Sequence, residues 1–447
     1  MVNRTFANVL FGVVLLFTGS NFGSAQQISA LSEERYQYLH SHPELSGQEV
    51  NTSAYLKSAL SKAGFTIVDS LGIHSFAGIF YNGKGPVVMY RTDMDALPIV
   101  EETGCTFAPG AAIKSDKPIV RMHACGHDVH MTTWLEVAEQ LIQQKNTWKG
   151  TVIFLAQSSE ETGQGARAVL ASENFKKLPK ADYNIAFHNT PELPSGTVGF
   201  CDGYAFAAVD MMNITVKGKG GHGAEPYRAV DPVLLAAYLV TELQSIVSRN
   251  LPPNDPAVIT VGAIHGGTVG NIIPSEVELK LTIRSYSEES RKKILQRIEE
   301  IGNGLAASAG LDTSNYPTYT LLDMSIPSVY NTPEMGKMLA AALQGNKIPT
   351  SVMTSKMIGE DFGVYGTSKQ IRSYMLWIGT TSTNQNDCPD LENCFTSKLH
   401  TSDYFPDYTV TIPMAVKTMR TALVSLFTTR PIPITHSVSP SLNKTEQ

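Results

Sequence analysis

Cysteines and runs of basic residues are scarce in this chain, and their scarcity argues against several classes of protein. The 447 residues include only five cysteines, and a chain of this length can build a core without a framework of disulfides. The net charge is -6 and lysine and arginine are not clustered, so we expect no nucleic-acid partner. Beyond the N-terminus we expect no membrane span, which needs roughly 20 apolar residues. These absences favour a small-molecule partner.

The composition is that of a globular protein, with 42% hydrophobic and 17% charged residues. At this length roughly two to three domain-sized units are expected. Residues 1–25 have the pattern of a secretory signal peptide, with an apolar stretch over residues 7–18 and small residues before Ala25. That stretch is shorter than a membrane anchor requires, which favours export to a periplasm or the cell exterior. The polar residues 431–447 predict a loose tail.

Between residues 28 and 209, short apolar segments alternate with segments of helical spacing. Segments rich in β-branched and aromatic residues predict strands, and apolar positions three and four residues apart predict helices. The alternation predicts an α/β catalytic domain, in which helices cover both faces of a sheet. The predicted strands are 76–81, 87–91, 152–156 and 185–188, and the predicted helices are 33–42, 50–63, 131–144 and 165–172.

Residues 210–322 have a pattern that predicts a separate small α+β domain. Strands are predicted over 211–217, 257–264 and 276–284, and helices over 231–248 and 288–310. We expect this domain to be an insertion, because His400 lies beyond it and is a candidate for the same site as the earlier residues. The catalytic domain therefore resumes over residues 323–430.

Residues that ligate metals occur at the ends of the predicted strands and in one short motif. Thiolates, imidazoles and carboxylates suit divalent transition metals, and an adjacent free carboxylate suits a general base. A bound metal lowers the pKa of water to ~7, so the combination points to a metal hydrolase. Strand ends in an open α/β sheet face a common crevice, which can gather distant residues. The candidates are Cys125, His127, Asp128, Asp93, Asp95, Glu160, Glu161, His188 and His400.

Each candidate also has an ordinary structural interpretation. A single Cys-x-His pair can be coincidental, adjacent acids are usually solvated, and isolated histidines are usually structural. Glu160 and Glu161 follow a predicted buried strand and precede two glycines, which favours an inward-facing role. A zinc deaminase is disfavoured, because its Pro-Cys-x-x-Cys element is absent. Histidines without comparable placement are interpreted as core or surface residues, namely His40, His42, His74, His123, His130 and His265.

Several motifs together resemble one family over residues 35–425. It is the family of metal-dependent amidohydrolases that includes hippurate hydrolase, auxin-conjugate hydrolase and N-acyl-amino-acid hydrolases, related to aminoacylase and the dinuclear zinc carboxypeptidases. The resemblance implies the dinuclear exopeptidase fold, a mixed sheet between helices. The motifs are Arg91-Thr-Asp-Met-Asp-Ala-Leu-Pro98, Met122-His-Ala-Cys-Gly-His-Asp128, Glu160-Glu161, Gly220-Gly-His-Gly-Ala224, Gly266-Gly-Thr268, Asn271-Ile-Ile-Pro274 and Gly359-Glu-Asp-Phe362.

The same resemblance implies a site for two divalent metal ions, zinc or manganese. Glu160 is the implied general acid and base, and Asp95 the implied orienting carboxylate. No role is assigned to Asp93. Cys125 is implied to bridge the two ions. The implied ligands are Cys125, His127, Glu161, His188 and His400.

By the same resemblance, the inserted domain is a lid that mediates homodimer formation in many members. His222 is then implied to stabilise the oxyanion, from its own or a partner subunit. Asn271 and Arg284 are implied to hold the substrate carboxylate, which an arginine fork suits. The ordinary alternatives are a loop histidine at position 222 and a surface strand residue at position 284.

Some segments near the expected pocket depart from the family pattern. Gln157-Ser158-Ser159 replaces the usual Gln-Pro-Ala, and Tyr227 stands where a histidine is common. These changes put the particular substrate in doubt and leave the metal chemistry intact. Cys388 and Cys394 flank a short polar loop and could pair as a disulfide. The remaining cysteines outside the motif, Cys105 and Cys201, are interpreted as unpaired thiols.

The sequence therefore predicts an exported hydrolase that cleaves the amide bond of an N-acyl amino acid or a related conjugate and releases a free amino acid. A dipeptidase or carboxypeptidase on the same fold is one alternative. A catalytically silent metal-binding relative is another, because fold alone does not fix function. The presence of Glu160 argues against the silent relative, which has no need of a base.

Overall fold

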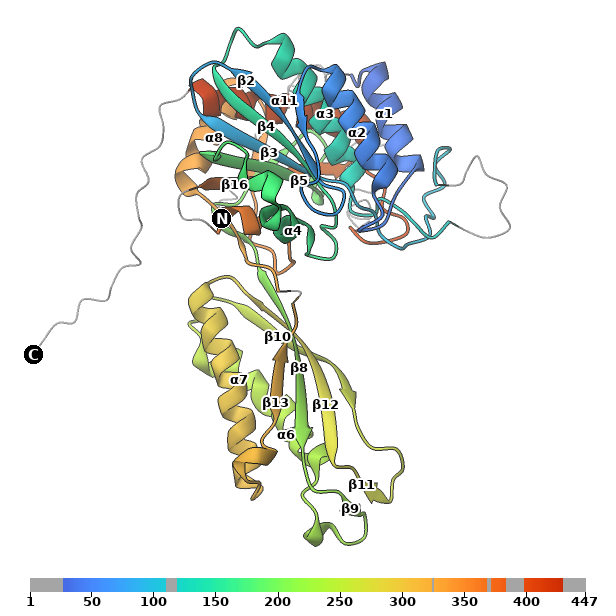
Figure 1. The fold of residues 1–447 in the computed structure, drawn as a ribbon, viewed down its shortest axis with the longest axis vertical. Helices are drawn as coiled ribbons and strands as arrows, with labels where there is room; N and C mark the ends of the chain where they lie inside the picture. The colour runs from blue at the N-terminus through green and yellow to red at the C-terminus, as the bar shows by residue number, and fades with distance from the viewer. Residues whose placement is uncertain (1–26, 110–118, 324, 368–370, 383–397, 429–447) are drawn as a thin grey trace, which may run out of the picture.

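The computed structural model describes residues 27–109, 119–323, 325–367, 371–382 and 398–428. Two units are visible along its long axis (Figure 1). We call the part that contains the larger sheet the main unit, and the part built from residues 208–321 the distal unit. The predicted signal peptide, the loose tail and the Cys388 and Cys394 pair lie outside the described residues.

The main unit is built on an eight-stranded mixed sheet. Its central strands β4, β3, β5 and β16 run parallel, whereas β2 is antiparallel to β4 and β6 is antiparallel to β16. This arrangement confirms the predicted mixed sheet. In sheet order the strands are β1 (Thr66–Val68), β2 (Phe76–Asn82), β4 (Gly150–Gln157), β3 (Val87–Asp93), β5 (Tyr183–Pro194), β16 (Arg372–Thr381), β6 (Val198–Phe200) and β15 (Thr350–Val352).

Apolar side chains cover both faces of this sheet. Phe154 of β4 belongs to the core under the larger group of helices, and its neighbour Leu155 belongs to the core on the opposite face. A strand that is buried on both sides needs apolar residues at every position, which explains the unbroken apolar run of β4. The main-unit helices are α1 (Ala30–Ser41), α2 (Val50–Lys62), α3 (His127–Gln143), α4 (Gly165–Ala171), α5 (Glu173–Lys176), α8 (Pro333–Gly345), α9 (Gly363–Gly366) and α11 (Tyr408–Thr428).

Helix α11 is long and apolar enough to cross a membrane, whereas we expected no such segment beyond the N-terminus. It instead packs against α3 and α8, and 61% of its most apolar window is buried. Its buried side chains include Ile412, Met419 and Leu423. Because a core helix passes the same test of length and composition, α11 is a helix of the main-unit core.

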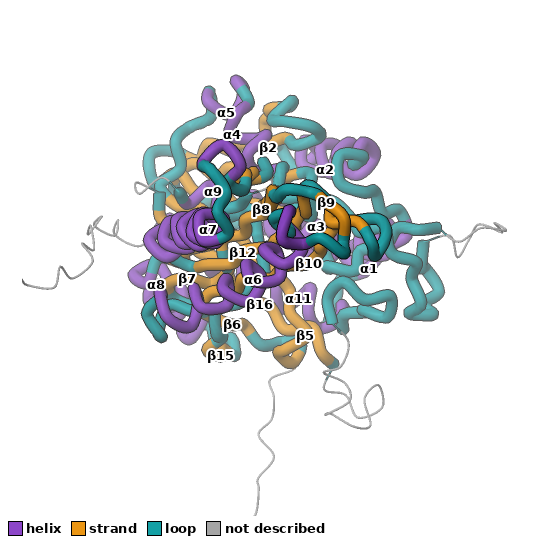
Figure 2. Tube along the Cα trace, turned by 90° about the horizontal axis from the view of Figure 1, so that it is seen from below, coloured by secondary structure: helices purple, strands orange, loops and turns teal. Residues whose placement is uncertain are grey.

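The distal unit is a four-stranded antiparallel sheet with two long helices. Helix α6 packs against α7, and both contact β12 (Figure 2). Asp231 caps α6 by accepting a hydrogen bond from the backbone nitrogen of Val233. In sheet order the strands are β10 (Ala257–His265), β12 (Glu276–Ser285), β8 (Ala208–Lys217) and β13 (Thr318–Leu321), and the helices are α6 (Pro232–Ser245), η2 (Ile246–Asn250) and α7 (Glu288–Ser308).

Two short strands, β9 (Gly221–His222) and β11 (Ile272–Ile273), pair at the tip of the distal unit, far from the larger sheet (Figure 1). At the other end of the unit, β8 and β12 lead back to the main unit. There β7 (Gly203–Phe206) pairs with β14 (Val329–Asn331). The two remaining helical turns are η1 (Pro226–Arg228) and η3 (Thr313–Asn315).

Candidate metal centre

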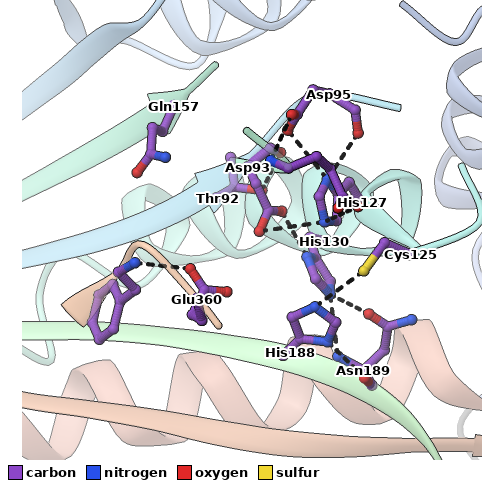
Figure 3. Close-up of polar contacts among 12 residues, drawn as sticks. Thr92, Asp93, Asp95, Cys125, His127, His130, Gln157, His188, Asn189 and Glu360 are labelled. Atoms are coloured by element: carbon purple, nitrogen blue, oxygen red, sulfur yellow. Dashed lines mark hydrogen bonds and ion pairs between the residues drawn. The ribbon is translucent and has the colours of Figure 1, made fainter. Parts of the chain in front are cut away.

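The ends of β3 and β4 and the start of α3 meet beside β5 in the main unit (Figure 3). Because β3 and β4 are parallel neighbours, Asp93 at the end of β3 lies level with Gln157 at the end of β4. The chain then turns through Ser158 and Ser159 to place two glutamates at the same edge. Gly165 permits this turn, since a Cβ there would lie 1.8 Å from the carbonyl oxygen of Ser158.

The thiol of Cys125 lies at the centre of the cluster. Its Sγ is 3.4 Å from Nε2 of His188 and 3.3 Å from Nε2 of His400. Nε2 of His400 is also 3.5 Å from Oε1 of Glu161. Residues from four separate parts of the sequence therefore converge, although His188 lies in the middle of β5 rather than at its end.

A glycine makes the motif around Cys125 possible. Gly126 has a φ of 76°, in the left-handed region, and it immediately precedes the first residue of α3. A Cβ at this position would lie 2.0 Å from Nδ2 of Asn189, so no larger residue fits. The turn places Cys125 and His127 close together, so that with His188 their ligand atoms lie within 4.8 Å of one another.

Hydrogen bonds to backbone carbonyls orient two of the imidazoles. Nδ1 of His127 is 2.8 Å from the carbonyl oxygen of Asp95, and Nδ1 of His188 is 2.7 Å from that of Asn189. A carbonyl accepts only, so each Nδ1 carries a proton and each Nε2 is the nitrogen that remains for a metal. This is the orientation in which histidine ligates a metal.

The central atoms have the chemistry of a cation site. Nε2 of His127 is 3.9 Å from Oε1 of Glu161, and both atoms are buried without a hydrogen-bond partner. Buried polar atoms without partners are costly, and a cation between them removes that cost. The thiol, imidazoles and carboxylate are also a fitting donor set for divalent transition metals. Overlapping groups of these residues have ligand atoms within 4.8 Å of one another.

The pKa shifts of these residues indicate which of the candidate ligand atoms hold a proton. Burial, followed by the negative charges of Glu161 and Glu160, raises the pKa of the Cys125 thiol well above its usual range. Burial raises the pKa of Glu161 to about 7, against the opposing charge of His127. Burial, reinforced by His130, lowers the pKa of His188 well below its usual range. Metal ligands bind in their deprotonated forms, so metal binding here releases protons.

Glu160 forms one of the possible ligand groups with His127 and Glu161. It is buried, and burial raises its pKa well above the usual range, followed by the charges of Glu360 and Glu161. A carboxyl group that holds a proton near neutral pH can act as both acid and base. Burial thus raises the pKa of both adjacent glutamates, Glu160 and Glu161.

The carboxylate of Asp95 contacts two residues of the cluster, His127 and Glu161. Its Oδ2 accepts hydrogen bonds from the Ser46 hydroxyl at 2.6 Å and from the backbone nitrogen of Glu161 at 2.9 Å. Its Oδ1 is 3.5 Å from Nδ1 of His127. Asp95 therefore positions both the imidazole and the segment that carries the glutamates.

His130 belongs to this cluster, which corrects its interpretation as a core or surface residue without a place in the site. Nδ1 of His130 is 2.7 Å from Oδ1 of Asp93, and its Nε2 accepts a hydrogen bond from the backbone nitrogen of Asn189 at 3.1 Å. The other oxygen of Asp93 is 3.8 Å from Nε2 of His127. Asp93 thus contacts both histidines, and the three residues form another of the groups that could hold a cation. The spacing of three residues between the two histidines, one helical turn, was the available signal.

A buried arginine network on the other side of Asp93 was also missed. The guanidinium of Arg91 donates to Asp93 at 2.6 Å and to Asp361 at 2.9 Å, and lies 3.1 Å from Oε1 of Glu360. Oε2 of Glu360 is buried without a partner. In the sequence, the two adjacent acids of the motif Gly359-Glu-Asp-Phe362 are the signal for such a network.

The distal-unit candidates do not join the cluster within one chain. His222 and Asn271 are exposed and lie at or next to the β9 and β11 tip, far from β3 and β5 (Figure 1). Arg284, in contrast, lies at the base of the distal unit, where a Cβ on Gly359 would be 3.7 Å from its Nη1. Burial lowers the pKa of this half-buried guanidinium. Only Arg284 of the three therefore approaches the segment that carries Glu360.

A cluster of this kind on an α/β sheet defines a metal-dependent hydrolase, and comparisons with known proteins agree. A family model described as peptidase family M20/M25/M40 matches residues 89–401. The chain belongs to this family and is a metal-dependent amidohydrolase of it.

Relatives with named activities cover most of the chain. It is 33% identical to N-acetylcysteine deacetylase of Bacillus subtilis over 381 residues, which are 85% of this chain and 96% of that protein. It is 38% identical to N-acetyldiaminopimelate deacetylase of the same species over 350 residues, which are 77% of this chain and 88% of that protein. A crystal structure of a Bacillus subtilis dinuclear metal-binding peptidase of the M20 family superposes with a TM-score of 0.72 and 28% identity, covering 89% of this chain and 98% of that one. With the ligand groups above, this likeness indicates a centre for two divalent metal ions.

Proposed function

We propose that the protein hydrolyses the amide bond of N-acyl amino acids, or of closely related conjugates, and releases the free amino acid. The observation that carries this proposal is the convergence of Cys125, His188, His400 and Glu161 into one cluster, with the buried Glu160 beside it. Relatives that are named as deacetylases of N-acetyl amino acids support the choice of substrate class.

Two divalent cations, zinc or manganese, are held by five side chains in this proposal. The thiolate favours zinc, and a carboxylate and imidazole set also accepts manganese. When bound, the cations polarise the substrate carbonyl and acidify a water molecule. Cys125 lies between two imidazoles and is the proposed bridge. The proposed ligands are Cys125, His127, Glu161, His188 and His400.

Glu160 is the proposed proton carrier. It takes the proton from the attacking water and delivers it to the nitrogen of the departing amino acid. Its buried position and raised pKa suit both steps, because the carboxyl group must hold the proton between them. Asp95 acts through His127 and through the backbone of Glu161, which it holds in place.

His222 is proposed to act in the site of a partner subunit within a homodimer. Its Nδ1 accepts a hydrogen bond from the backbone nitrogen of Ala224 at 3.0 Å, so Nε2 carries the proton and can donate. An exposed donor at the tip of the distal unit fits a role in a neighbouring site better than one in its own. There it stabilises the negative oxygen that develops during hydrolysis. Asn271 lies beside the partner strand of His222 and is proposed to contact the same substrate.

Arg284 is proposed to hold the substrate carboxylate. Its guanidinium has no carboxylate partner among the residues that the structure describes, and burial lowers its pKa. A half-buried guanidinium without a counter-ion is a good receptor for an anionic ligand. Its place beside Gly359 brings that receptor to the junction between the two units.

The leader over residues 1–25 is proposed to direct export of the protein, to a periplasm or the cell exterior. A chain with this leader is expected to be shorter by those residues once exported. Mass spectrometry of the exported protein tests this directly, and an exported protein that retains residues 1–25 contradicts it.

A substrate screen tests the proposed function. Purified protein with measured metal content is incubated with N-acetyl, N-benzoyl and indole-acetyl amino acids and with dipeptides, and the released amine is quantified. We expect the N-acyl amino acids to be cleaved faster than dipeptides with a free amino terminus. The reverse order indicates a dipeptidase, and no turnover with full metal content indicates a silent relative.

A further inference from the structure

Three further metal-ligating side chains converge outside the dinuclear centre. His40 comes from α1, and Glu101 and Cys105 come from the segment after β3. Nε2 of His40 is 3.1 Å from Oε1 of Glu101 and 3.6 Å from Sγ of Cys105. Sγ of Cys105 is 3.5 Å from the same Oε1. One nitrogen, one oxygen and one sulfur thus form what we call the Cys105 triangle.

Two of the three edges of this triangle match one face of a tetrahedral zinc site, and the third is slightly shorter. Zinc binds sulfur at about 2.3 Å and nitrogen or oxygen at about 2.0–2.2 Å, which at tetrahedral angles separates the ligand atoms by roughly 3.3–3.6 Å. The two edges that involve Sγ fall at 3.6 and 3.5 Å, and the remaining edge is 3.1 Å. A cation can therefore enter with little movement of the side chains.

The imidazole of His40 is fixed in the direction that ligation needs. Its Nδ1 is 2.7 Å from Oδ2 of Asp128, and the side chain of His40 is only 2% exposed. A carboxylate on one ring nitrogen and a cation on the other is a recurrent arrangement in metal proteins. Asp128 lies in the first turn of α3, next to His127, but contributes no atom to the triangle.

The two carboxylate oxygens of Glu101 differ in their numbers of hydrogen-bond partners, which points to a missing ligand. Its Oε1 faces three potential donors, from His40, Thr103 and Cys105. Its Oε2 is buried and has no partner, although the side chain is only 3% exposed. With hydrogen bonds alone, Oε1 has several donors and Oε2 has none. A cation at the triangle relieves this arrangement, because the carboxylate can then bind it through either oxygen.

We propose that the Cys105 triangle binds a third divalent cation, of the thiophilic kind represented by Zn²⁺ and Cd²⁺. The new bonds run to Nε2 of His40, to Sγ of Cys105 and to the carboxylate of Glu101. The protons that leave are the thiol proton of Cys105 and the Nε2 proton of His40, and both pass to solvent. Cys105 is partly exposed, which gives the cation a path from solvent. Once bound, the cation ties α1 to the segment after β3.

Metal stoichiometry tests the proposal in the full-length protein. Protein stripped with a chelator is equilibrated with Zn²⁺, and bound metal is counted by elemental analysis in wild type, Cys105→Ser and Cys201→Ser. Cys201 is the matched control, because it is a buried thiol that donates to the carbonyl of Tyr204 at 3.6 Å outside both clusters. We expect Cys105→Ser to bind one equivalent less than wild type and Cys201→Ser to bind as much as wild type. Equal binding by wild type and Cys105→Ser overturns the proposal.

This difference is independent of the dinuclear centre, because only the loss between variants is measured. If the centre holds fewer ions than proposed, the totals change for all three proteins while the loss of one equivalent in Cys105→Ser remains. Failure of the proposed function and failure of this inference are therefore distinguishable.

A second measurement uses unaltered protein and does not depend on the folding of a variant. Alkylation of Cys105 by iodoacetamide is followed by peptide mass spectrometry with and without Zn²⁺. A thiolate bound to a cation is a poor nucleophile, so we expect Zn²⁺ to slow alkylation of Cys105 by at least about tenfold. Unchanged alkylation of Cys105 in the presence of saturating Zn²⁺ contradicts the proposal.

Discussion

Gly126-His127 in the main unit and Gly221-His222 in the distal unit are the same pair of residues in opposite surroundings. His127 is buried, its Nδ1 is fixed by the carbonyl of Asp95, and its Nε2 faces other polar atoms of its own chain. His222 is exposed, its Nδ1 is fixed by the backbone nitrogen of Ala224, and its Nε2 faces solvent. The comparison shows that the main unit gathers its candidate metal ligands within one chain. The tip of the distal unit instead presents a hydrogen-bond donor that has no such site in its own surroundings.

Metal removal is the largest perturbation of the main unit and should leave the distal unit unaffected. We expect stripping by a chelator to abolish turnover and to destabilise the main unit by about 4 kcal/mol for each ion that was present at ~1,000 times its dissociation constant. Hydrogen exchange read by mass spectrometry measures both units at once. Exchange should accelerate in β3 and β5 and stay constant in β8 and β12. Equal acceleration in both units contradicts the assignment of the metal centre to the main unit.

The substitution Glu160→Gln tests the proposed proton carrier. The amide keeps the shape of the side chain but cannot accept the proton, so we expect kcat to fall by roughly 10²–10⁴-fold. Metal content is measured alongside, and it should match wild type because Glu160 is not a proposed ligand. Glu173→Gln is the control, since Glu173 is an exposed main-unit glutamate paired with Lys176. Undiminished turnover in Glu160→Gln excludes the proposed mechanism.

The substitution His222→Ala tests whether the distal tip serves a partner subunit. Loss of one oxyanion donor costs roughly 10²–10³-fold in kcat. His265→Ala is the control, because His265 is an exposed histidine of the same unit. Hydrolysis is measured with a good substrate found in the screen, and both variants should remain folded.

Mixing two inactive variants sharpens the same comparison. Each site of a homodimer would take Glu160 from one subunit and His222 from the other. An equal mixture of Glu160→Gln and His222→Ala subunits then forms hybrid dimers with one intact site, which restores about one quarter of wild-type activity for random exchange. If His222 serves its own subunit, every site in the mixture carries a defect. An absence of recovered activity, with hybrid dimers shown by native mass spectrometry, contradicts the shared site.

The sequence predicts those parts of the centre whose residues lie close together along the chain. Cys125 and His127 are separated by one glycine, and Glu160 follows a strand whose apolar run requires burial on both faces. Both features are local, so their chemistry can be recognised before the fold is known. The alternation of strands and helices likewise predicts the mixed sheet, because each element must bury its own apolar face.

The missed residues depend on contacts across long stretches of sequence. His130 gains its role from Asp93, and Arg91 gains its role from Asp361, which is 270 residues away. An arginine inside an apolar strand looks unfavourable until its acidic partners are known. The same reason explains α11, whose apolar composition could be judged only after its packing against α3 and α8 was seen. Composition shows which residues need partners, and only the fold supplies them.

The smallest expected effect belongs to Arg284, the one of the three distal-unit candidates that approaches the main unit. A hydrogen bond to a charged group contributes about 1.5–3 kcal/mol, so Arg284→Ala should lower kcat/KM by roughly 10- to 150-fold, mainly through KM. The loss should vanish for substrates whose carboxylate is replaced by a carboxamide, because they offer no anion to bind. Arg249→Ala, at an exposed arginine of the same unit, is the control. An equal loss for carboxylate and carboxamide substrates would assign Arg284 a structural role and leave the carboxylate receptor to be sought within the main unit.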